Sequence, residues 1–304
     1  MRVGLPQELT HIEWIEELKT GLSYLIPDIE WIHTPSVKDR QPLFPGTDAC
    51  FPFKKMVRTS LNLSSRVDLL FIPRAVSLDG YLMCPNFRAL PDIVSINIKR
   101  MDKDKTVPVI SPLMEIRNRR QLDSLIKKTA KELISGYGLH GSENILYGKD
   151  EQNVKYQRDI SHSIALIGHP YLLEDKRLNN GAPEILKNYD FRTISSTELP
   201  FRELNRLASS YDFYAKKMYW RPGREILGAF LYFTRIRRPA GIIQLVAFNC
   251  GIEALLRIEL MSLYRQMKNP PPYMVIVCDE HVQREHVVTR IEAFLDIING
   301  FSIK

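Results

Sequence analysis

Residues 241–253 read GIIQLVAFNCGIE, and this stretch decides the fold that the sequence predicts. Residues 242–248 are nearly all apolar or β-branched, which is typical of a strand buried on both faces of a parallel sheet. A polar turn follows, and an apolar-periodic helix is predicted to begin near Ile252. Cys250 therefore lies where α/β proteins bind ligands: beyond the carboxyl end of a strand, at a helix N-terminus whose partial positive charge favours a thiolate.

Strand and helix patterns alternate along the rest of the chain. The predicted strands are residues 2–5, 29–33, 67–73, 106–110, 164–168, 192–195 and 273–277. The predicted helices are residues 9–25, 115–139, 182–188, 203–215, 224–232 and 287–298. Residues 74–80 are expected to leave the sheet as a loop that leads to Cys84.

This alternation predicts the α/β fold class, with two doubly wound, Rossmann-like domains of mostly parallel sheets that face each other across a crevice. The polar stretch at 153–159 is the expected connection. We therefore expect an N-terminal α/β domain at residues 1–155, with Cys50 and Cys84, and a C-terminal α/β domain at residues 156–304, with Cys250.

Composition narrows the classes of partner. The 304 residues carry a net charge of +7 and are 44% hydrophobic. The small basic excess is spread over both halves, which suits an anionic small molecule such as a phosphate or coenzyme A and argues against a nucleic-acid or membrane surface. No apolar run is long enough to cross a bilayer and the N-terminus has no signal core, so a cytoplasmic location is expected. No GxGxxG motif supports nucleotide binding by the chain itself.

The four cysteines are too few for a disulfide framework in a chain of this length. Cys50, Cys84 and Cys250 each lie at a predicted strand end or helix start, beside Pro or Gly or two residues from one, but no CxxC pair occurs. Three converging thiolates would suit an iron-sulfur cluster with one open iron, or a zinc ion with an open position. Cysteines that fill small gaps in a core would give the same pattern, and both interpretations stand at this level.

Seven other polar residues are candidates for second-shell or catalytic roles near such a site. His169 follows a predicted strand. The polar groups expected to face an anionic ligand or partner are Arg74, Ser77, Arg221 and Arg224, although an ion pair between Arg224 and Glu225 would be purely structural. A hydrolase role for the Asp-Glu-His stretch that follows the last strand lacks a Gly-x-Ser-x-Gly nucleophile. Cys278 is either a buried strand residue or a fourth thiol. The seven candidates are Arg74, Ser77, His169, Arg224, Glu225, Glu280 and His281.

Several motifs, in order along the chain, resemble the 2-hydroxyacyl-CoA dehydratase superfamily, in particular its branch of acyl-CoA dehydratase activase-related proteins. They are VGLPQEL (3–9), ACFPFK (49–54), FIPRAVSLDG (71–80), CPNFRALPD (84–92), IALIGHPYLL (164–173), YWRPGREILGAFLYF (219–233), FNCG (248–251), and DEH (279–281) with TRIEAFLD (289–296). The branch commonly continues Gly-Pro-Asp-Ser after the last cysteine, whereas this chain has Gly251-Ile252-Glu253-Ala254. It also has Val282-Gln283-Arg284-Glu285 where Thr-Gly-Glu is usual.

The resemblance implies that Cys50, Cys84 and Cys250 hold a [4Fe-4S] cluster that accepts one electron from an ATP-hydrolysing activator. It also implies a low-potential reduction or radical dehydration of an acyl-CoA-type substrate under anaerobic conditions, as a lyase or an ATP-dependent reductase component. A second dehydratase-like subunit or a homodimer would complete such a system. The alternatives are a non-catalytic iron-sulfur electron-relay or assembly subunit, and a zinc-bound or metal-free structural protein.

Overall fold

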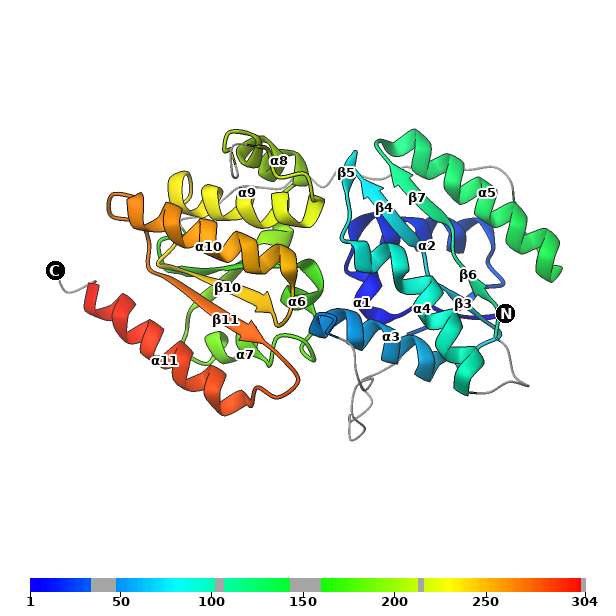
Figure 1. The fold of residues 1–304 in the computed structure, drawn as a ribbon, viewed down its shortest axis with the longest axis horizontal. Coiled ribbons are helices and arrows are strands. Elements are labelled where there is room, and N and C mark those ends of the chain that lie inside the picture. Colours follow the sequence, from blue (N-terminus) through cyan, green and yellow to red (C-terminus); the bar gives the residue numbers. More distant parts are fainter. Residues whose placement is uncertain (34–47, 102–106, 143–159, 213–215, 302–304) are drawn as a thin grey trace. The chain divides into compact units, whose positions relative to one another are not determined.

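The computed structural model describes residues 1–33, 48–101, 107–142, 160–212 and 216–301 (Figure 1). The chain divides into two compact units. Unit 1 comprises Met1–Thr47 and Phe53–Glu151, and unit 2 comprises Asp48–Pro52 and Gln152–Lys304. Among the described residues, no helix combines the length and the apolar character needed to cross a membrane.

Unit 1 is built on a four-stranded parallel sheet with the order β2-β1-β3-β6. Its strands are β1 (Arg2–Gly4), β2 (Glu30–Ile32), β3 (Leu69–Phe71) and β6 (Val109–Ile110). Its helices are α1 (Gln7–Thr10), α2 (Glu13–Leu25), α3 (Phe51–Ser64), α4 (Pro85–Met101) and α5 (Arg119–Tyr137), of which α3 begins in unit 2. Helices α2 and α5 pack against each other so closely that a Cβ atom on Gly21 of α2 would lie 2.6 Å from the Ile126 side chain of α5.

A second, three-stranded sheet in unit 1 has the order β5-β4-β7, with β4 (Arg74–Leu78), β5 (Tyr81–Leu82) and β7 (Leu113–Ile116). The prediction of a loop at 74–80 is therefore wrong, and so is the predicted helix start at residue 115, because α5 begins only at Arg119. Buried and exposed residues alternate strictly along β7, as in a strand with one face covered. A bulge in the pairing of β4 with β7 breaks that period and hid β4 from the pattern.

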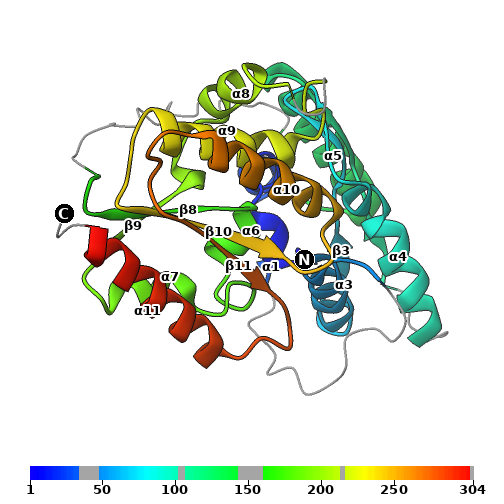
Figure 2. The ribbon, with the colours of Figure 1, turned by 60° about the vertical axis from the view of Figure 1, so that its left-hand side comes forward.

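Unit 2 is built on a parallel sheet with the order β11-β10-β8-β9. Its strands are β8 (Ser163–Ile167), β9 (Arg192–Ser195), β10 (Gly241–Ala247) and β11 (Tyr273–Cys278). Its helices are α6 (Pro170–Glu174), α7 (Ala182–Lys187), α8 (Phe201–Ser209), α9 (Arg221–Arg235), α10 (Gly251–Gln266) and α11 (Arg284–Phe301), with a 3-10 turn at Ser196–Glu198. Helices α9 and α10 cover one face of the sheet, and α7 and α11 cover the other (Figures 1 and 2).

These observations confirm the predicted α/β class with mostly parallel sheets. Strand β10 is buried at every position, as its continuous apolar run predicts. The predicted domain boundary between residues 155 and 156 lies outside the described residues. Cys50 was assigned to the N-terminal domain from its place in the sequence, but the segment Asp48–Pro52 that contains it groups with unit 2.

The strand order of unit 2 fixes where a ligand can reach the sheet. After β8 the chain adds β9 on one side, and β10 and β11 on the other, so the direction of winding reverses between β8 and β10. In open α/β sheets such a switch point opens a crevice at the carboxyl ends of the two strands. The residues that follow β8 and β10 are Gly168-His169 and Phe248-Asn249-Cys250. Unit 1 has the corresponding switch point between β1 and β3.

Candidate functional site

Cys250 occupies the position immediately before helix α10 and is 8% exposed. Asn249 precedes it with φ of 60°, a left-handed conformation that asparagine tolerates better than most residues. The Cys250 amide donates to the carbonyl of Ala247 at 3.1 Å, which closes the turn between strand and helix. The thiol is thus held at the start of a 16-residue helix, as the sequence predicts.

His169 follows β8 and precedes the short helix α6. A Cβ atom on the neighbouring Gly168 would lie 2.8 Å from the carbonyl oxygen of Leu245, so only glycine lets the end of β8 approach β10 this closely. The imidazole is 2% exposed and stacks on the ring of Tyr171, with 5.1 Å between ring centroids. Its Nε2 atom lies 3.6 Å from the Sγ atom of Cys250.

Glu253 completes this group and is not among the site residues predicted from the sequence. It lies in the first turn of α10, is fully buried, and its Oε2 atom accepts a hydrogen bond from the Ala247 amide at 2.6 Å. The same oxygen lies 3.6 Å from Nε2 of His169. One ligand atom each from His169, Cys250 and Glu253 lies within 4.8 Å of the others. The Cys-x-x-Glu spacing resembles a capping box, in which the third helical residue reaches back to the helix start, and this was the available signal.

Burial sets the protonation of this group. It lowers the pKa of His169 to about 3, so the imidazole is neutral at pH 7. It raises the pKa of Glu253 to about 8, against the partial opposition of hydrogen bonds from the Ala247 amide and Cys250. In the absence of a metal the 3.6 Å contact between the two residues is therefore neutral rather than an ion pair. His169 Nδ1 and Glu253 Oε1 are buried without a hydrogen-bond partner among the described residues.

Cys50 comes to the same unit from a distant part of the sequence. It is 8% exposed and directly precedes helix α3. The amide of the next residue, Phe51, donates to the carbonyl of Phe248 at 3.1 Å, and Phe248 lies two residues before Cys250. This backbone hydrogen bond holds the Cys50 segment beside the turn that carries Cys250.

Cys84 lies in unit 1, directly before the 17-residue helix α4. Desolvation raises the pKa of its thiol, while hydrogen bonds from the backbone of Asn86 and Phe87 act in the opposite direction. All three predicted metal-binding cysteines thus directly precede helices of at least 14 residues. Free amides at such positions favour the thiolate that a metal requires.

The residues after β11 are arranged differently. Cys278 ends the strand, is fully buried, and burial raises the pKa of its thiol. Its carbonyl accepts a hydrogen bond from the Phe248 amide at 2.9 Å. Glu280 and His281 contact each other at 3.7 Å, and the His281 side chain is 85% exposed.

The candidates Arg74 and Arg224 form hydrogen bonds and ion pairs within the fold. Arg74 forms a bidentate pair with Asp92, with N–O distances of 2.7 and 2.6 Å, and also donates to the carbonyl of Arg88. Ser77, also on β4, pairs in register with Leu82 of β5.

Arg224 is 2% exposed and joins α9 to α8. Its guanidinium donates to the side chains of Asn205 and Ser209 and to the Met218 carbonyl at 2.5 Å. Glu225 forms an ion pair at 2.5 Å with Arg221, one helical turn away.

Comparison with known proteins places these observations in a family. Residues 36–199, just over half of the chain, match the family described as CoA enzyme activase uncharacterised domain (DUF2229). The matched segment contains Cys50, Cys84 and His169. No curated protein matches the chain. The chain belongs to the CoA enzyme activase uncharacterised domain family, which is consistent with the activase-related branch.

Proposed function

We propose that this chain is the cluster-bearing component of an activase and dehydratase system that acts on CoA thioesters. In this proposal Cys50, Cys84 and Cys250 hold a [4Fe-4S] cluster, and the chain accepts one electron from an ATP-hydrolysing activator. The electron serves a low-potential reduction or a radical dehydration of an acyl-CoA-type substrate. The family match supports a role in an activase and dehydratase system, and the order of the motifs supports the choice of the three cysteines as ligands.

The observation that carries the proposal is the hydrogen bond between Phe51 and Phe248, which holds the Cys50 segment beside the Cys250 turn in unit 2. Two cysteines far apart in sequence thereby precede helix N-termini in one buried region. Thiolates are the ligands that iron-sulfur clusters require, so the donor set fits the group. Buried polar atoms on His169 and Glu253 that lack hydrogen-bond partners among the described residues fit a region built around a further group.

Each part of the site has a task that follows from its position. The three cysteines supply ligands, and the helix N-termini behind them stabilise negative charge on the thiolates. Neutral His169 and the carboxyl of Glu253 border Cys250 and exclude water from one side of it. The cluster itself would supply one-electron transfer at low potential.

Anoxic reconstitution with iron and sulfide tests the ligand assignment. We expect the wild-type chain to gain a broad visible absorption band, and Cys84→Ser to lose most of that band and of the bound iron. Cys278→Ala is the matched control, because it removes a buried thiol that the proposal does not use, and it should load like the wild type. Full iron content and unchanged absorbance in Cys84→Ser would remove Cys84 from the ligand set.

A specific observation favours a second candidate, an electron-relay subunit without catalysis of its own. Arg74 and Arg224, which were expected to face an anionic ligand, are engaged with Asp92 and with Asn205 and Met218, respectively. The loaded chain should be mixed with an activator, ATP, a reductant and acyl-CoA thioesters. Turnover by the chain, alone or with a second dehydratase-like subunit, supports catalysis, whereas cluster reduction without turnover in either mixture supports the relay.

A further inference from the structure

The atoms of His169, Cys250 and Glu253 have the spacing of ligands around one metal ion. For tetrahedral zinc, bond lengths of about 2.3 Å to sulfur and about 2.05 Å to nitrogen or oxygen place S and N ligand atoms about 3.6 Å apart, and N and O ligand atoms about 3.4 Å apart. The observed separations are 3.6 Å from Sγ of Cys250 to Nε2 of His169, and 3.6 Å from that nitrogen to Oε2 of Glu253. In a [4Fe-4S] cluster the protein ligands bind different irons and lie farther apart than 3.6 Å, so these separations fit ligands of one ion better.

The surroundings of the three side chains fit a cation. All three are at most 8% exposed, and in the described part of the chain no lysine or arginine forms an ion pair with Glu253. Oε1 of Glu253 is buried without a hydrogen-bond partner among those residues. An unpartnered buried carboxyl oxygen is costly, so this side chain has polar capacity beyond its hydrogen bond to the Ala247 amide.

The backbone holds the group in place before any metal arrives. Gly168 brings the end of β8 against Leu245, the turn at Asn249 directs Cys250, and the Ala247 amide orients the Glu253 carboxylate. These contacts come from β8, β10 and α10 at the switch point of a single unit. The site is therefore complete within unit 2.

We propose that His169, Cys250 and Glu253 bind one divalent transition-metal ion of the zinc or ferrous class, in tetrahedral geometry with a fourth position open to water or a small ligand. One sulfur, one imidazole and one carboxylate with an open position are typical of reactive rather than structural zinc sites. The inference goes beyond the proposed function but shares Cys250 with it. A given chain thus holds either the single ion or the cluster.

Cobalt titration of the full chain, after chelation under anoxic conditions, tests this site because Co²⁺ reports thiolate ligation and tetrahedral geometry in its spectrum. We expect one Co²⁺ per chain, a thiolate-to-cobalt charge-transfer band and intense visible bands. Cys250→Ser should abolish the charge-transfer band, and His169→Ala and Glu253→Gln should each weaken Co²⁺ binding at least about tenfold, because each removes a ligand. Cys84→Ser should bind Co²⁺ like the wild type.

The same variants separate this inference from the cluster proposal. Loss of iron loading in Cys84→Ser with intact Co²⁺ binding supports both assignments. Co²⁺ bands that disappear in Cys84→Ser but persist in His169→Ala and Glu253→Gln would overturn the three-residue site and leave the cluster standing. If iron loading is unchanged in Cys84→Ser and Co²⁺ binding is lost in His169→Ala, the cluster proposal is overturned and the three-residue site stands.

X-ray absorption spectroscopy of the zinc-loaded wild-type chain needs no variant and is independent of any folding defect. The inference predicts one sulfur ligand at about 2.3 Å and three nitrogen or oxygen ligands at about 2.0–2.1 Å. A shell of two or more sulfur ligands, or of none, would overturn it.

Discussion

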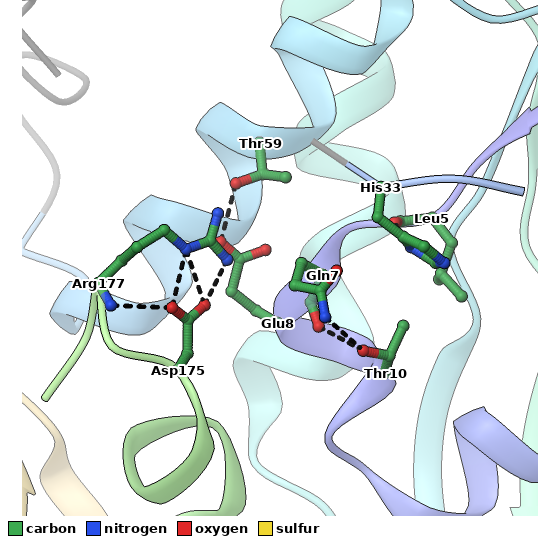
Figure 3. A network of polar contacts seen from close by, with 8 residues as sticks. All are labelled: Leu5, Gln7, Glu8, Thr10, His33, Thr59, Asp175 and Arg177. Atoms are coloured by element: carbon green, nitrogen blue, oxygen red, sulfur yellow. Dashed lines mark hydrogen bonds and ion pairs between the residues drawn. The ribbon is translucent and has the colours of Figure 1, made fainter. Parts of the chain in front are cut away.

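In unit 1 the switch point between β1 and β3 is followed by Glu8, whose fully buried carboxylate accepts a hydrogen bond from Thr59 at 2.9 Å (Figure 3). Around it, Gln7 and Thr10 hydrogen-bond to each other, and Nδ1 of His33 contacts the Leu5 carbonyl at 2.8 Å. In unit 2 the equivalent position between β8 and β10 carries His169 and Cys250, with Glu253 behind them.

The two switch points share a strand order and differ in chemistry. The carboxylate in unit 1 accepts a hydrogen bond from the Thr59 hydroxyl, a contact that joins α1 to α3. The group in unit 2 combines thiol, imidazole and carboxylate, which are ligands for transition metals. Topology therefore supplies the location, and the side chains placed there decide whether it is structural or reactive. Within unit 2 another polar contact at the end of α6, between Asp175 and Arg177, is of the structural kind (Figure 3).

The largest expected difference between the two switch points concerns metal content. Cys250→Ser should lose all specific metal binding, both iron after reconstitution and Co²⁺ after chelation, because Cys250 is a ligand in both proposals. Glu8→Gln in unit 1 should retain both. Metal analysis after gel filtration of the two variants makes the comparison, and equal metal content would show that the switch point of unit 2 has no special role.

Gly168→Ala should destabilise the chain by about 2–3 kcal/mol, because the added Cβ would meet the Leu245 carbonyl at 2.8 Å and force β8 away from β10. It should also weaken Co²⁺ binding by displacing His169. Urea unfolding and the cobalt titration measure the two effects. Gly251→Ala is the matched control, since a Cβ there meets nothing within 4 Å. Unchanged stability in Gly168→Ala would mean that the strand ends are not held as tightly as described.

Thr59→Val keeps the shape of the side chain but removes the hydroxyl that donates to Glu8. The stability of the chain should fall by about 1–2 kcal/mol, because a buried carboxylate loses a hydrogen bond. Metal binding in unit 2 should not change. A loss of metal binding in this variant would contradict the view that the contact is purely structural.

The pH dependence of the metal-free chain should carry the signature of Glu253. Its pKa is near 4.5 in the unfolded chain and about 8 in the fold, so between these values the folded chain binds more protons and stability falls as pH rises. The pKa of His169 is 6.5 in the unfolded chain and about 3 in the fold. Between these values the unfolded chain binds the extra proton, so His169 makes stability rise with pH.

Between pH 6.5 and 8, Glu253 therefore changes the free energy of unfolding without an opposing contribution from His169. This free energy should fall by at most about 1.4 kcal/mol per pH unit there. Glu253→Gln should remove this slope, measured by urea unfolding across that range. A slope as steep in the variant as in the wild type would place its origin elsewhere.

The smallest effect is expected at the partly exposed pair of Arg74 and Asp92. Hydrogen bonding to Arg74 holds the pKa of Asp92 below its usual value of 3.8, so the pair stabilises the fold above that pH and loses this contribution as pH falls through the lowered pKa. Asp92→Asn should lower stability at pH 7 by less than about 1 kcal/mol. A loss of several kcal/mol would indicate that Arg74 has a larger structural role.

Much of unit 2 could be predicted from the sequence because its signals are local. The buried run of β10 and the break before Cys250 fix a strand, a turn and a helix start within thirteen residues. Strand β9 was predicted with the bounds that the structure has, Arg192–Ser195. His169 was predicted in the same way, because Gly168 and Pro170 on either side of it mark the end of the preceding strand.

What could not be predicted depends on long-range contacts or broken periods. Cys50 groups with unit 2 through a hydrogen bond from Phe51 to a residue almost two hundred positions away, which no local pattern records. Glu253 looked like a departure from a family motif, and only its backbone partner at Ala247 shows that the side chain turns inward. Strand β4 was missed because a bulge interrupts its alternation.

The most direct test of the account is the iron and acid-labile sulfide content of the wild-type chain after anoxic reconstitution. The account predicts about four iron and four sulfide per chain, the content of one [4Fe-4S] cluster. A folded chain that retains neither iron nor sulfide would contradict the claim that Cys50, Cys84 and Cys250 hold a cluster.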